Sequence, residues 1–246
     1  MTNKHILQIS HVFKYFGGLV ANSDISFHLN EGEILGLVGS NGAGKTTLFN
    51  CITGCFPPSK GDIIFNQKRL NGKSPDAICK AGMARTWQIV RPLPTMTVRQ
   101  NVVIGALNRH NMKQAQVIAN EKLALVGLAD IADQLAGSLP IGLRKRLEVA
   151  RALATEPRVI LFDEPCGGLN ANETDEILDL IKTLRASTGL SVIFIEHDMK
   201  AVAKLCDRVV CLEYGEMLAE GTPAEVFNNP AVIESYLGKM EDTDNA

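Results

Sequence analysis

The sequence predicts an α/β fold that is built around a loop for binding a nucleoside triphosphate. A glycine-rich segment at residues 39–47 lies between an apolar run and the start of a helical pattern. Two further apolar runs, at residues 158–165 and 191–197, end in polar side chains, as buried parallel strands do where they reach a ligand site. Short strand patterns before residue 66 and a helical pattern after residue 100 add a small antiparallel sheet and a helical insertion.

Composition is that of an ordinary globular protein. The 246 residues suffice for one large or two small domains, and the formal net charge of −2 provides no overall attraction to nucleic acid. The first residues lack the apolar core of a signal peptide, and no apolar run approaches the roughly 18–20 residues of a membrane span. We therefore expect a cytosolic protein, or one that is attached to a membrane through its partners.

The six cysteines show no spacing that is typical of a zinc site. They lie in otherwise apolar segments, with Cys51 and Cys55 expected on the helix after the glycine-rich loop and Cys206 and Cys211 near a late strand. We expect reduced, buried thiols.

The segments before the glycine-rich loop are predicted to form an antiparallel sheet beside it. Residues 25–30 alternate between apolar and polar side chains, and residues 7–9 and 62–65 indicate two further strands. Between the first two strands, Tyr15 and Phe16 precede two glycines. An aromatic ring at this loop tip would stack on a base, and a packed turn explains the pattern equally well.

The glycine-rich loop contains two glycines five residues apart, followed by Lys and Thr. Glycine lets backbone N–H groups turn toward a phosphate, and the N-terminus of the next helix adds partial positive charge. Lys45 would reach the β- and γ-phosphates, and the Thr46 hydroxyl would hold Mg²⁺. The candidate nucleotide-binding residues here are Ser40, Asn41, Gly42, Ala43, Gly44, Lys45, Thr46 and Thr47. The loop alone leaves open a kinase, a GTPase, a helicase or a transporter motor.

The middle of the chain is predicted to be helical between two loops. Two prolines and the isolated Gln88 indicate a loop at residues 85–94. A helix is expected to begin near Thr97 as its cap, and the helical pattern continues to about residue 135 without coiled-coil heptads. A segment with Pro140 and Gly142 then leads into an amphipathic helix whose N-terminus would face a phosphate. The basic run at residues 144–146 also fits an ordinary solvated helix.

The two later apolar runs end in candidate catalytic residues. The first ends in Asp163 and Glu164, at the carboxyl end of a buried strand, where α/β sheets bind ligands. We expect Asp163 to join the coordination of Mg²⁺ and Glu164 to polarise a water. The second run ends in His197. A lone histidine is more often structural, but its position at a strand end favours a functional role.

The last part of the chain is predicted to contain a hairpin at residues 207–220 and a capping box at residues 222–225, with Pro223 at the first helical position. Residues 241–246 are polar and expected to be frayed. We find no internal repeat or linker. The expected organisation is a single domain, residues 1–246, with a helical insertion at about residues 88–153.

The ordered set of motifs resembles the ATPase subunits of ABC transporters. The set consists of the phosphate loop, Gln88, the segment 139–153, the Asp-Glu-Pro sequence at 163–165, and His197. Kinases, GTPases and helicases lack this combination. Segments 82–88, 195–199 and 220–238 further resemble the ATP-binding subunits of branched-chain amino-acid importers. The resemblance implies a phosphate-loop NTPase core of the RecA type, with an antiparallel β-subdomain and an inserted helical subdomain, as in ABC ATPases.

The resemblance also implies roles for individual residues. Phe16 would stack on adenine, with Tyr15 as the alternative. Gln88 would touch Mg²⁺ or the attacking water and pass its state to a membrane partner. Glu164 would be the general base, and His197 would hold the γ-phosphate. Residues 167–170 would line the contact with an opposite ATPase subunit.

One segment departs from the family pattern. The usual signature Leu-Ser-Gly-Gly-Gln is replaced by Leu-Pro-Ile-Gly-Leu at residues 139–143, so Gly142 and the helix after it remain to meet a phosphate. This departure predicts a heterodimer with a second, different ATPase subunit, with a homodimer as the alternative.

By this resemblance we expect an ATP- and Mg²⁺-dependent ATPase that energises a membrane importer, with branched-chain amino acids as the substrate class. Its partners would be transmembrane permease subunits, a second ATPase subunit and, indirectly, a substrate-binding protein, and it would lie peripherally on the cytoplasmic face of the cell membrane. The alternatives are a related system for urea import or lipopolysaccharide export, and a soluble ABC ATPase acting on DNA or ribosomes. No coiled-coil insertion or second ATPase half supports the soluble alternative, and the Asp-Glu pair with His197 argues against a binder that does not hydrolyse.

Overall fold

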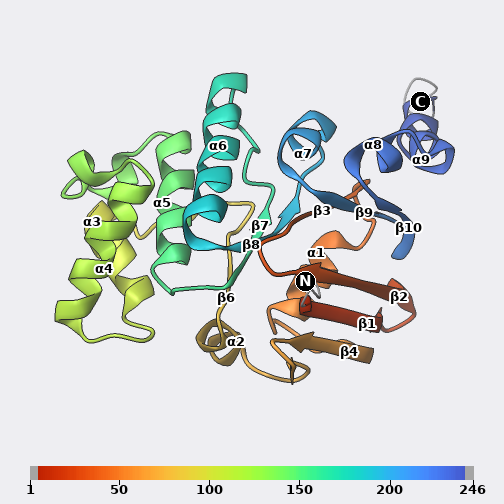
Figure 1. The fold of residues 1–246 in the computed structure, drawn as a ribbon, viewed down its shortest axis with the longest axis horizontal. Coiled ribbons are helices and arrows are strands. Elements are labelled where there is room, and N and C mark those ends of the chain that lie inside the picture. Colours follow the sequence, from red (N-terminus) through yellow and green to blue (C-terminus); the bar gives the residue numbers. More distant parts are fainter. Residues whose placement is uncertain (1–4, 242–246) are drawn as a thin grey trace. The chain divides into compact units, whose positions relative to one another are not determined.

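The computed structural model describes residues 5–241 (Figure 1). These residues form two compact units, one with the residues up to 75 and from 191 onward, and one with residues 76–190. The first unit contains β1 (His5–Phe16), β2 (Leu19–Asn30), β3 (Ile34–Gly39), α1 (Lys45–Ile52), β4 (Lys60–Phe65), β5 (Lys68–Arg69), β8 (Ser191–Ile195), α7 (Met199–Leu205), β9 (Arg208–Glu213), β10 (Glu216–Gly221), α8 (Pro223–Phe227) and α9 (Pro230–Glu241). The second contains α2 (Pro75–Ala81), β6 (Met83–Arg85), α3 (Val98–Ala106), α4 (Met112–Leu125), the short 3₁₀ helices η1 (Ala129–Ile131) and η2 (Ala136–Ser138), α5 (Ile141–Leu153), β7 (Val159–Asp163) and α6 (Ala171–Thr188).

The predicted antiparallel sheet is present in the first unit, with the strand order β2-β1-β4-β5. β1 pairs with both β2 and β4, and the pairing of Ile9 with Phe27 and Ile63 aligns the apolar positions of the three strands. Ile9, Ile25 and Leu29 are buried, while the polar residues between them on β2 are partly exposed. The alternation in the sequence therefore correctly predicted which face of this sheet packs on the core.

A second sheet of the first unit carries the glycine-rich loop. β3 is parallel to β8 on one side and to β9 on the other, and β10 returns antiparallel to β9. All residues of β3 and β8 are buried, as expected for parallel strands that are covered on both faces. At Gly36 an added Cβ would lie 3.0 Å from Val202 of α7, so glycine lets this helix pack closely on β3. The predicted strands and the β9–β10 hairpin are confirmed.

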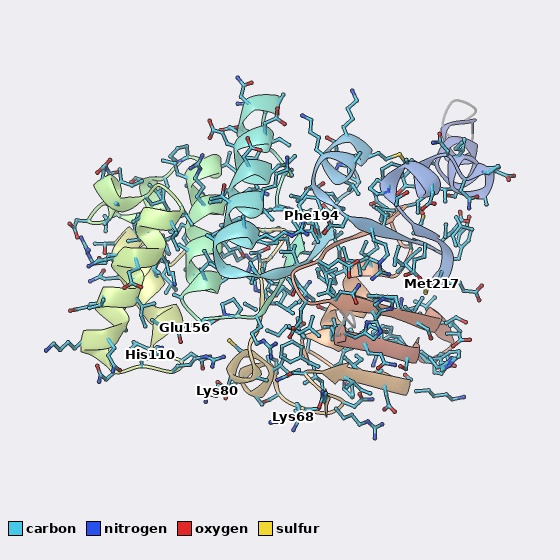
Figure 2. All side chains as sticks on the ribbon, viewed as in Figure 1. Lys68, Lys80, His110, Glu156, Phe194 and Met217 are labelled. Carbon is cyan, nitrogen blue, oxygen red and sulfur yellow. The ribbon has the colours of Figure 1, made fainter. Side chains whose placement is uncertain are left out.

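The two sheets of the first unit also meet through β10 and β2. The sulfur of Met217 accepts a hydrogen bond from the backbone N–H of Ser26 at 3.4 Å (Figure 2). Phe194 on β8 is completely buried in the same unit. The Ser26–Met217 bond therefore joins the sheet that carries the loop to the antiparallel sheet.

The second unit is mainly helical, and its helices α3–α6 are drawn in green and cyan in Figure 1. The predicted helix start is confirmed, because Thr97 caps α3 in a reciprocal capping box with Gln100. His110, after α3, bonds Glu156, after α5, at 2.8 Å (Figure 2). The parallel pair β6–β7 brings residues 86–88 and 163–164 to one edge of this unit.

Some sequence-based expectations need correction. The sequence does not predict the short elements α2 and β6, and Arg85 lies in β6 and not in the expected loop at residues 85–94. Cys51, Cys166, Cys206 and Cys211 are buried, but Cys55 is exposed because it lies beyond the end of α1, and Cys79 is partly exposed. Of the predicted frayed end, residues 242–246 lie outside the described residues, and Glu241 is the last residue of α9. Within the described range, no helix has both the length and the apolar character that crossing a membrane requires.

Candidate functional site

The glycine-rich loop connects β3 to α1 and has the backbone that a phosphate loop requires. Gly39, Gly42 and Gly44 have φ angles of 144°, 83° and 94°. An added Cβ at Gly39 would lie 2.2 Å from the carbonyl oxygen of Leu212, and one at Gly44 would lie 2.5 Å from that of Ala21. Both conformation and space therefore demand glycine at these two positions.

Lys45, the first residue of α1, is turned back over this loop. Its Nζ donates to the carbonyl oxygens of Gly39 at 2.6 Å and Ser40 at 2.9 Å, and the residue is 7% exposed. Thr46 is exposed next to it at the helix start. The ammonium group thus lies over the loop that leads into the N-terminus of α1, and a positive charge at a helix N-terminus favours a bound phosphate.

Two neighbouring segments hold the loop in place. The side-chain amide of Asn22, on β2, donates to the Gly44 carbonyl at 3.2 Å, and Asn22 is completely buried. The N–H of Gly215, in the β9–β10 turn, donates to the Ala43 carbonyl at 3.2 Å. Sequence reasoning did not identify either support, because both join segments that are distant in the chain.

The predicted aromatic site is at the turn between β1 and β2. Phe16 is 45% exposed and packs edge-on against Phe56, with 5.3 Å between ring centroids. Lys14 lies over both rings, at 4.9 Å from the centroid of Phe16 and 4.5 Å from that of Phe56. Tyr15 is partly buried beside Phe13. Of the two candidates for base stacking, Phe16 therefore has the more exposed ring.

His197 follows β8, which is parallel to β3, so His197 and the phosphate loop lie at the same edge of the sheet. Its side chain is 65% exposed, and its Nδ1 is 3.7 Å from the Oε2 atom of the buried Glu196. Asp198 caps α7 by accepting from the Lys200 N–H at 2.8 Å. The imidazole is thus presented at the strand end by a segment whose backbone is fixed on both sides.

In the second unit, β7 delivers Asp163 and Glu164 to the edge at which β6 ends. Arg85 donates to the carboxylate of Asp163 at 2.6 Å, and both side chains are 5% exposed. The backbone N–H of Asp163 donates to the Thr86 hydroxyl at 3.3 Å. Since a buried carboxylate needs a partner for its charge, Arg85 accounts for the burial of Asp163. No local pattern in the sequence indicates this pairing.

Gln88 and Glu164 are brought into direct contact. The Gln88 side-chain amide donates to Oε2 of Glu164 at 2.6 Å. Glu164 has a φ of 49°, which costs roughly 1–2 kcal/mol for a residue other than glycine. Its carbonyl oxygen accepts from Lys145 Nζ at 3.1 Å and from the Gly167 N–H at 3.2 Å, and these bonds hold it in that conformation.

The segment 139–143 forms the start of α5. Pro140 occupies the N-cap position and makes no side-chain cap, whereas Ile141 is 42% exposed. Arg144 returns to this segment and donates to the carbonyl of Leu139 at 2.6 Å. An added Cβ at Gly142 would lie 3.0 Å from the carboxylate of Glu173. Arg144 thus holds the backbone just before the helix, while no side chain caps the N–H groups of the first turn.

Glu148, one helical turn after Lys145, is a buried carboxyl group that sequence reasoning missed. It accepts a 2.7 Å hydrogen bond from the Trp87 N–H and is 9% exposed. Burial raises the pKa of Glu148 to about 7, although this hydrogen bond and the nearby Arg151 and Lys145 oppose the shift. The alternative of an ordinary solvated basic helix at residues 144–146 is wrong for Lys145, which is 5% exposed.

The residues fit ATP and Mg²⁺ in their chemistry. Lys45 and the glycine-shaped loop suit the phosphates, and an exposed aromatic ring suits a base. Mg²⁺ prefers hard oxygen ligands and keeps much of its coordination shell for phosphates and water. Suitable oxygen ligands are the hydroxyl of Thr46, the side-chain amide of Gln88 and the carboxylate of Asp163. Among the residues described, no group of three or more His, Cys, Asp or Glu side chains could hold a metal ion.

Comparison with known protein families gives two matches. Residues 22–167 match the family described as ABC transporter. Residues 216–242 match the family described as branched-chain amino acid ATP-binding cassette transporter. The first match covers the segment from Asn22 on β2 through the phosphate loop to the turn after Glu164.

Individual proteins give the same result. The chain is 39% identical to the high-affinity branched-chain amino acid transport ATP-binding protein LivG of Salmonella typhimurium, over 95% of this chain and 98% of the relative. It is 37% identical to the corresponding protein BraF of Pseudomonas aeruginosa, over 96% and 99% of the two chains. A crystal structure of a nucleotide-free ATP-binding cassette from an ABC transporter superposes with a TM-score of 0.87, at 30% identity over 95% and 99% of the chains. The fold class is confirmed, and the chain belongs to the ABC transporter family as one of its ATPase subunits.

Proposed function

We propose that this ATPase subunit drives the import of branched-chain amino acids through a membrane permease. The family match at residues 216–242 carries this proposal, because that segment is described for branched-chain amino acid transporters and lies outside the general ABC transporter match. The names of the relatives support the same substrate class. Urea import and lipopolysaccharide export are the alternatives within the family.

In the proposed reaction, Lys45 and the loop N–H groups bind the β- and γ-phosphates, and Phe16 stacks on the adenine. Glu164 accepts a proton from the attacking water, Gln88 orients this carboxylate, and His197 bonds the γ-phosphate. Bound Mg²⁺, held by Thr46, Gln88 and Asp163, would neutralise phosphate charge. Phosphoryl transfer depends mainly on such positioning and charge stabilisation.

The permease is proposed to dock on the loop between β6 and α3. Trp87 and Ile89 are 53% and 66% exposed, and Leu93 is 37% exposed. Asn101 holds the backbone of this loop, since it accepts from the Leu93 N–H at 2.9 Å and donates to the Leu93 carbonyl at 3.1 Å. A fixed loop with exposed apolar side chains suits a protein partner. Docking there would hold the subunit peripherally at the cytoplasmic face of the membrane.

A second, different ATPase chain is proposed as the other half of the nucleotide sites. In this family, the signature segment of one subunit closes the ATP site of the other. Pro140 has neither a hydroxyl nor an N–H, so up to two donors to the γ-phosphate are missing from this segment. Because hydrogen bonds to charged groups contribute roughly 1.5–3 kcal/mol each, a homodimer would close its sites weakly. Strongly cooperative ATPase activity of this chain with permease alone would contradict the heterodimer.

The substrate class is tested by reconstituting the chain in vesicles with its permease, second ATPase subunit and substrate-binding protein. ATP-dependent uptake of labelled leucine, isoleucine or valine is expected, with no uptake of urea. Lys45→Ala should abolish uptake by removing the charge that faces the phosphates, and the exposed Lys73 provides the matched control Lys73→Ala. Uptake of urea alone would overturn the substrate assignment and leave the ATPase assignment intact.

A further inference from the structure

The helix α5 carries three polar side chains at every third position, Lys145, Glu148 and Arg151. Positions three residues apart are neighbours on a helix surface. Each of these side chains bonds a segment that contains a proposed catalytic residue, either the Gln88 loop or Glu164.

Two of these side chains hold the loop that contains Gln88. Glu148 accepts from the backbone N–H of Trp87 at 2.7 Å, directly before Gln88. Arg151 donates to the carbonyl of Arg91 at 3.2 Å, three residues after Gln88. The backbone on either side of Gln88 is therefore fixed to the same helix.

The third side chain holds the proposed base. Lys145 donates to the carbonyl of Glu164 at 3.1 Å, and Glu164 in turn accepts from the side chain of Gln88 at 2.6 Å. Each end of the Gln88–Glu164 contact is thus connected to α5 through a side chain of that helix.

Burial argues that these contacts have a role beyond packing. Lys145 and Glu148 are 5% and 9% exposed. Burying ionisable groups is costly unless they are hydrogen-bonded, and apolar side chains of similar size would fill the same space without that cost. What the polar atoms add to packing is that they hold the backbone at Trp87 and at Glu164.

We propose that Lys145 and Glu148 are positioning residues that make α5, the Gln88 loop and Glu164 move together. This inference rests on the proposed roles of Gln88 and Glu164 in hydrolysis. Because α5 begins at the signature segment, a displacement of that segment by the nucleotide of the second ATPase subunit would be transmitted to the base of this one. Lys145 and Glu148 would then link the two nucleotide sites.

The test uses the chain assembled with its permease and second ATPase subunit. Glu148→Leu removes the acceptor and keeps apolar bulk, whereas Glu148→Gln keeps an oxygen that accepts from the Trp87 N–H. Lys145→Met removes the donor to Glu164. Arg146→Met is the matched control, because Arg146 lies on the same helix but bonds the Val126 carbonyl and Glu176.

We expect Glu148→Leu and Lys145→Met to lower kcat by roughly ten- to one hundredfold, the scale of small displacements of catalytic groups, with KM and ATP affinity within about twofold of wild type. Glu148→Gln and Arg146→Met should retain the wild-type kcat. Hydrogen exchange at the amides of residues 86–91 should accelerate in Glu148→Leu and stay slow in Glu148→Gln. Lys145→Met provides the same test if Glu148→Leu does not assemble.

A wild-type kcat in the Leu and Met variants would overturn the proposal. A loss in Glu148→Gln equal to that in Glu148→Leu, or an equal loss in Arg146→Met, would also overturn it. Glu164→Gln in the same assembly distinguishes a failure of the proposed base from a failure of the positioning role. If Glu164→Gln keeps its turnover, the proposed base and this inference are both wrong, whereas an inactive Glu164→Gln with active Glu148→Leu and Lys145→Met refutes the positioning role alone.

Discussion

The side-chain amide of Gln88 donates a hydrogen bond of 2.6 Å to Oε2 of Glu164. The two residues are far apart in the sequence, and the parallel pairing of β6 with β7 brings them together. The bond fixes the orientation of the carboxylate that is proposed as the general base. It also directly joins that base to the loop proposed to face the permease.

Replacing Gln88 should therefore affect turnover and not nucleotide binding. In Gln88→Leu the base loses the donor that orients it, and we expect kcat to fall at least about tenfold. ATP affinity should remain within about twofold of wild type, because the phosphate-loop residues are unchanged. Steady-state ATPase assays and equilibrium nucleotide titration measure the two quantities. An unchanged kcat, or an equal loss of affinity, would contradict the assigned role.

Asn22 provides a test of how the phosphate loop is held. Its amide donates to the carbonyl of Gly44 at 3.2 Å, and its Oδ1 is buried and has no hydrogen-bond partner among the described residues. Asn22→Asp would bury a negative charge beside the phosphate site, so ATP affinity should fall at least about tenfold.

The matched variant Asn22→Leu loses one donor and also removes the unpaired oxygen. These effects oppose each other, so ATP affinity should stay within about threefold of wild type. Calorimetric titration of both variants with ATP measures the difference. Equal affinities for the Asp and Leu variants would show that Asn22 is not near the bound phosphates.

Glu148 should make stability depend on pH. Its pKa is about 7 in the folded protein, against an ordinary value of 4.5, so the folded state binds the proton more tightly than the unfolded state. The stabilisation is fully present below pH 4.5 and is lost as the pH rises through 7. At about 1.4 kcal/mol for each pKa unit, the change is of the order of 3 kcal/mol.

Glu148→Gln remains neutral at every pH and lacks this dependence. Its free energy of unfolding relative to wild type should therefore increase between pH 4.5 and 8, while all other titrating groups cancel in the comparison. Denaturant unfolding at a series of pH values measures it. A difference that is constant with pH would mean that Glu148 ionises as easily in the folded as in the unfolded protein.

The docking loop gives a prediction about membrane attachment. Leu93→Glu places a charge in the exposed apolar surface and should release the subunit from permease-containing membranes, with ATP binding unchanged. Val117 on α4 is 55% exposed and provides the control Val117→Glu. Sedimentation of membranes measures attachment. A Leu93→Glu variant that stays bound and coupled would place the docking surface elsewhere.

The sequence predicted the strands and helices that have strong local signals. Alternation identified β2, continuous apolar runs identified β3, β7 and β8, and Thr97 and Thr222 were identified as helix caps. It missed α2 and β6, because each is too short to show a period. It also missed α6, a helix of 18 residues, although Asn170 and Gly189 are typical cap residues at its two ends. β6 has three residues and is held by its pairing with β7 and not by its own propensity.

The sequence predicted the motif residues of the candidate site but not the residues that hold them in position. Lys45, Gln88 and Glu164 have chemistry and spacing that can be read along the chain. Asn22, Arg85 and Glu148 resemble ordinary polar residues until the fold places them against Gly44, Asp163 and Trp87. Such pairings depend on long-range packing, which leaves no periodic signal in the sequence.

The most direct test of the account is the ATPase rate of Glu164→Gln in the complete transporter. The substitution keeps the shape of the side chain and removes the proposed base. ATP should still bind, ATP-bound dimers should accumulate, and turnover should fall at least about one hundredfold, the scale of the loss of a general base. Turnover within about twofold of wild type would contradict the assignment of Glu164 and the mechanism built on it.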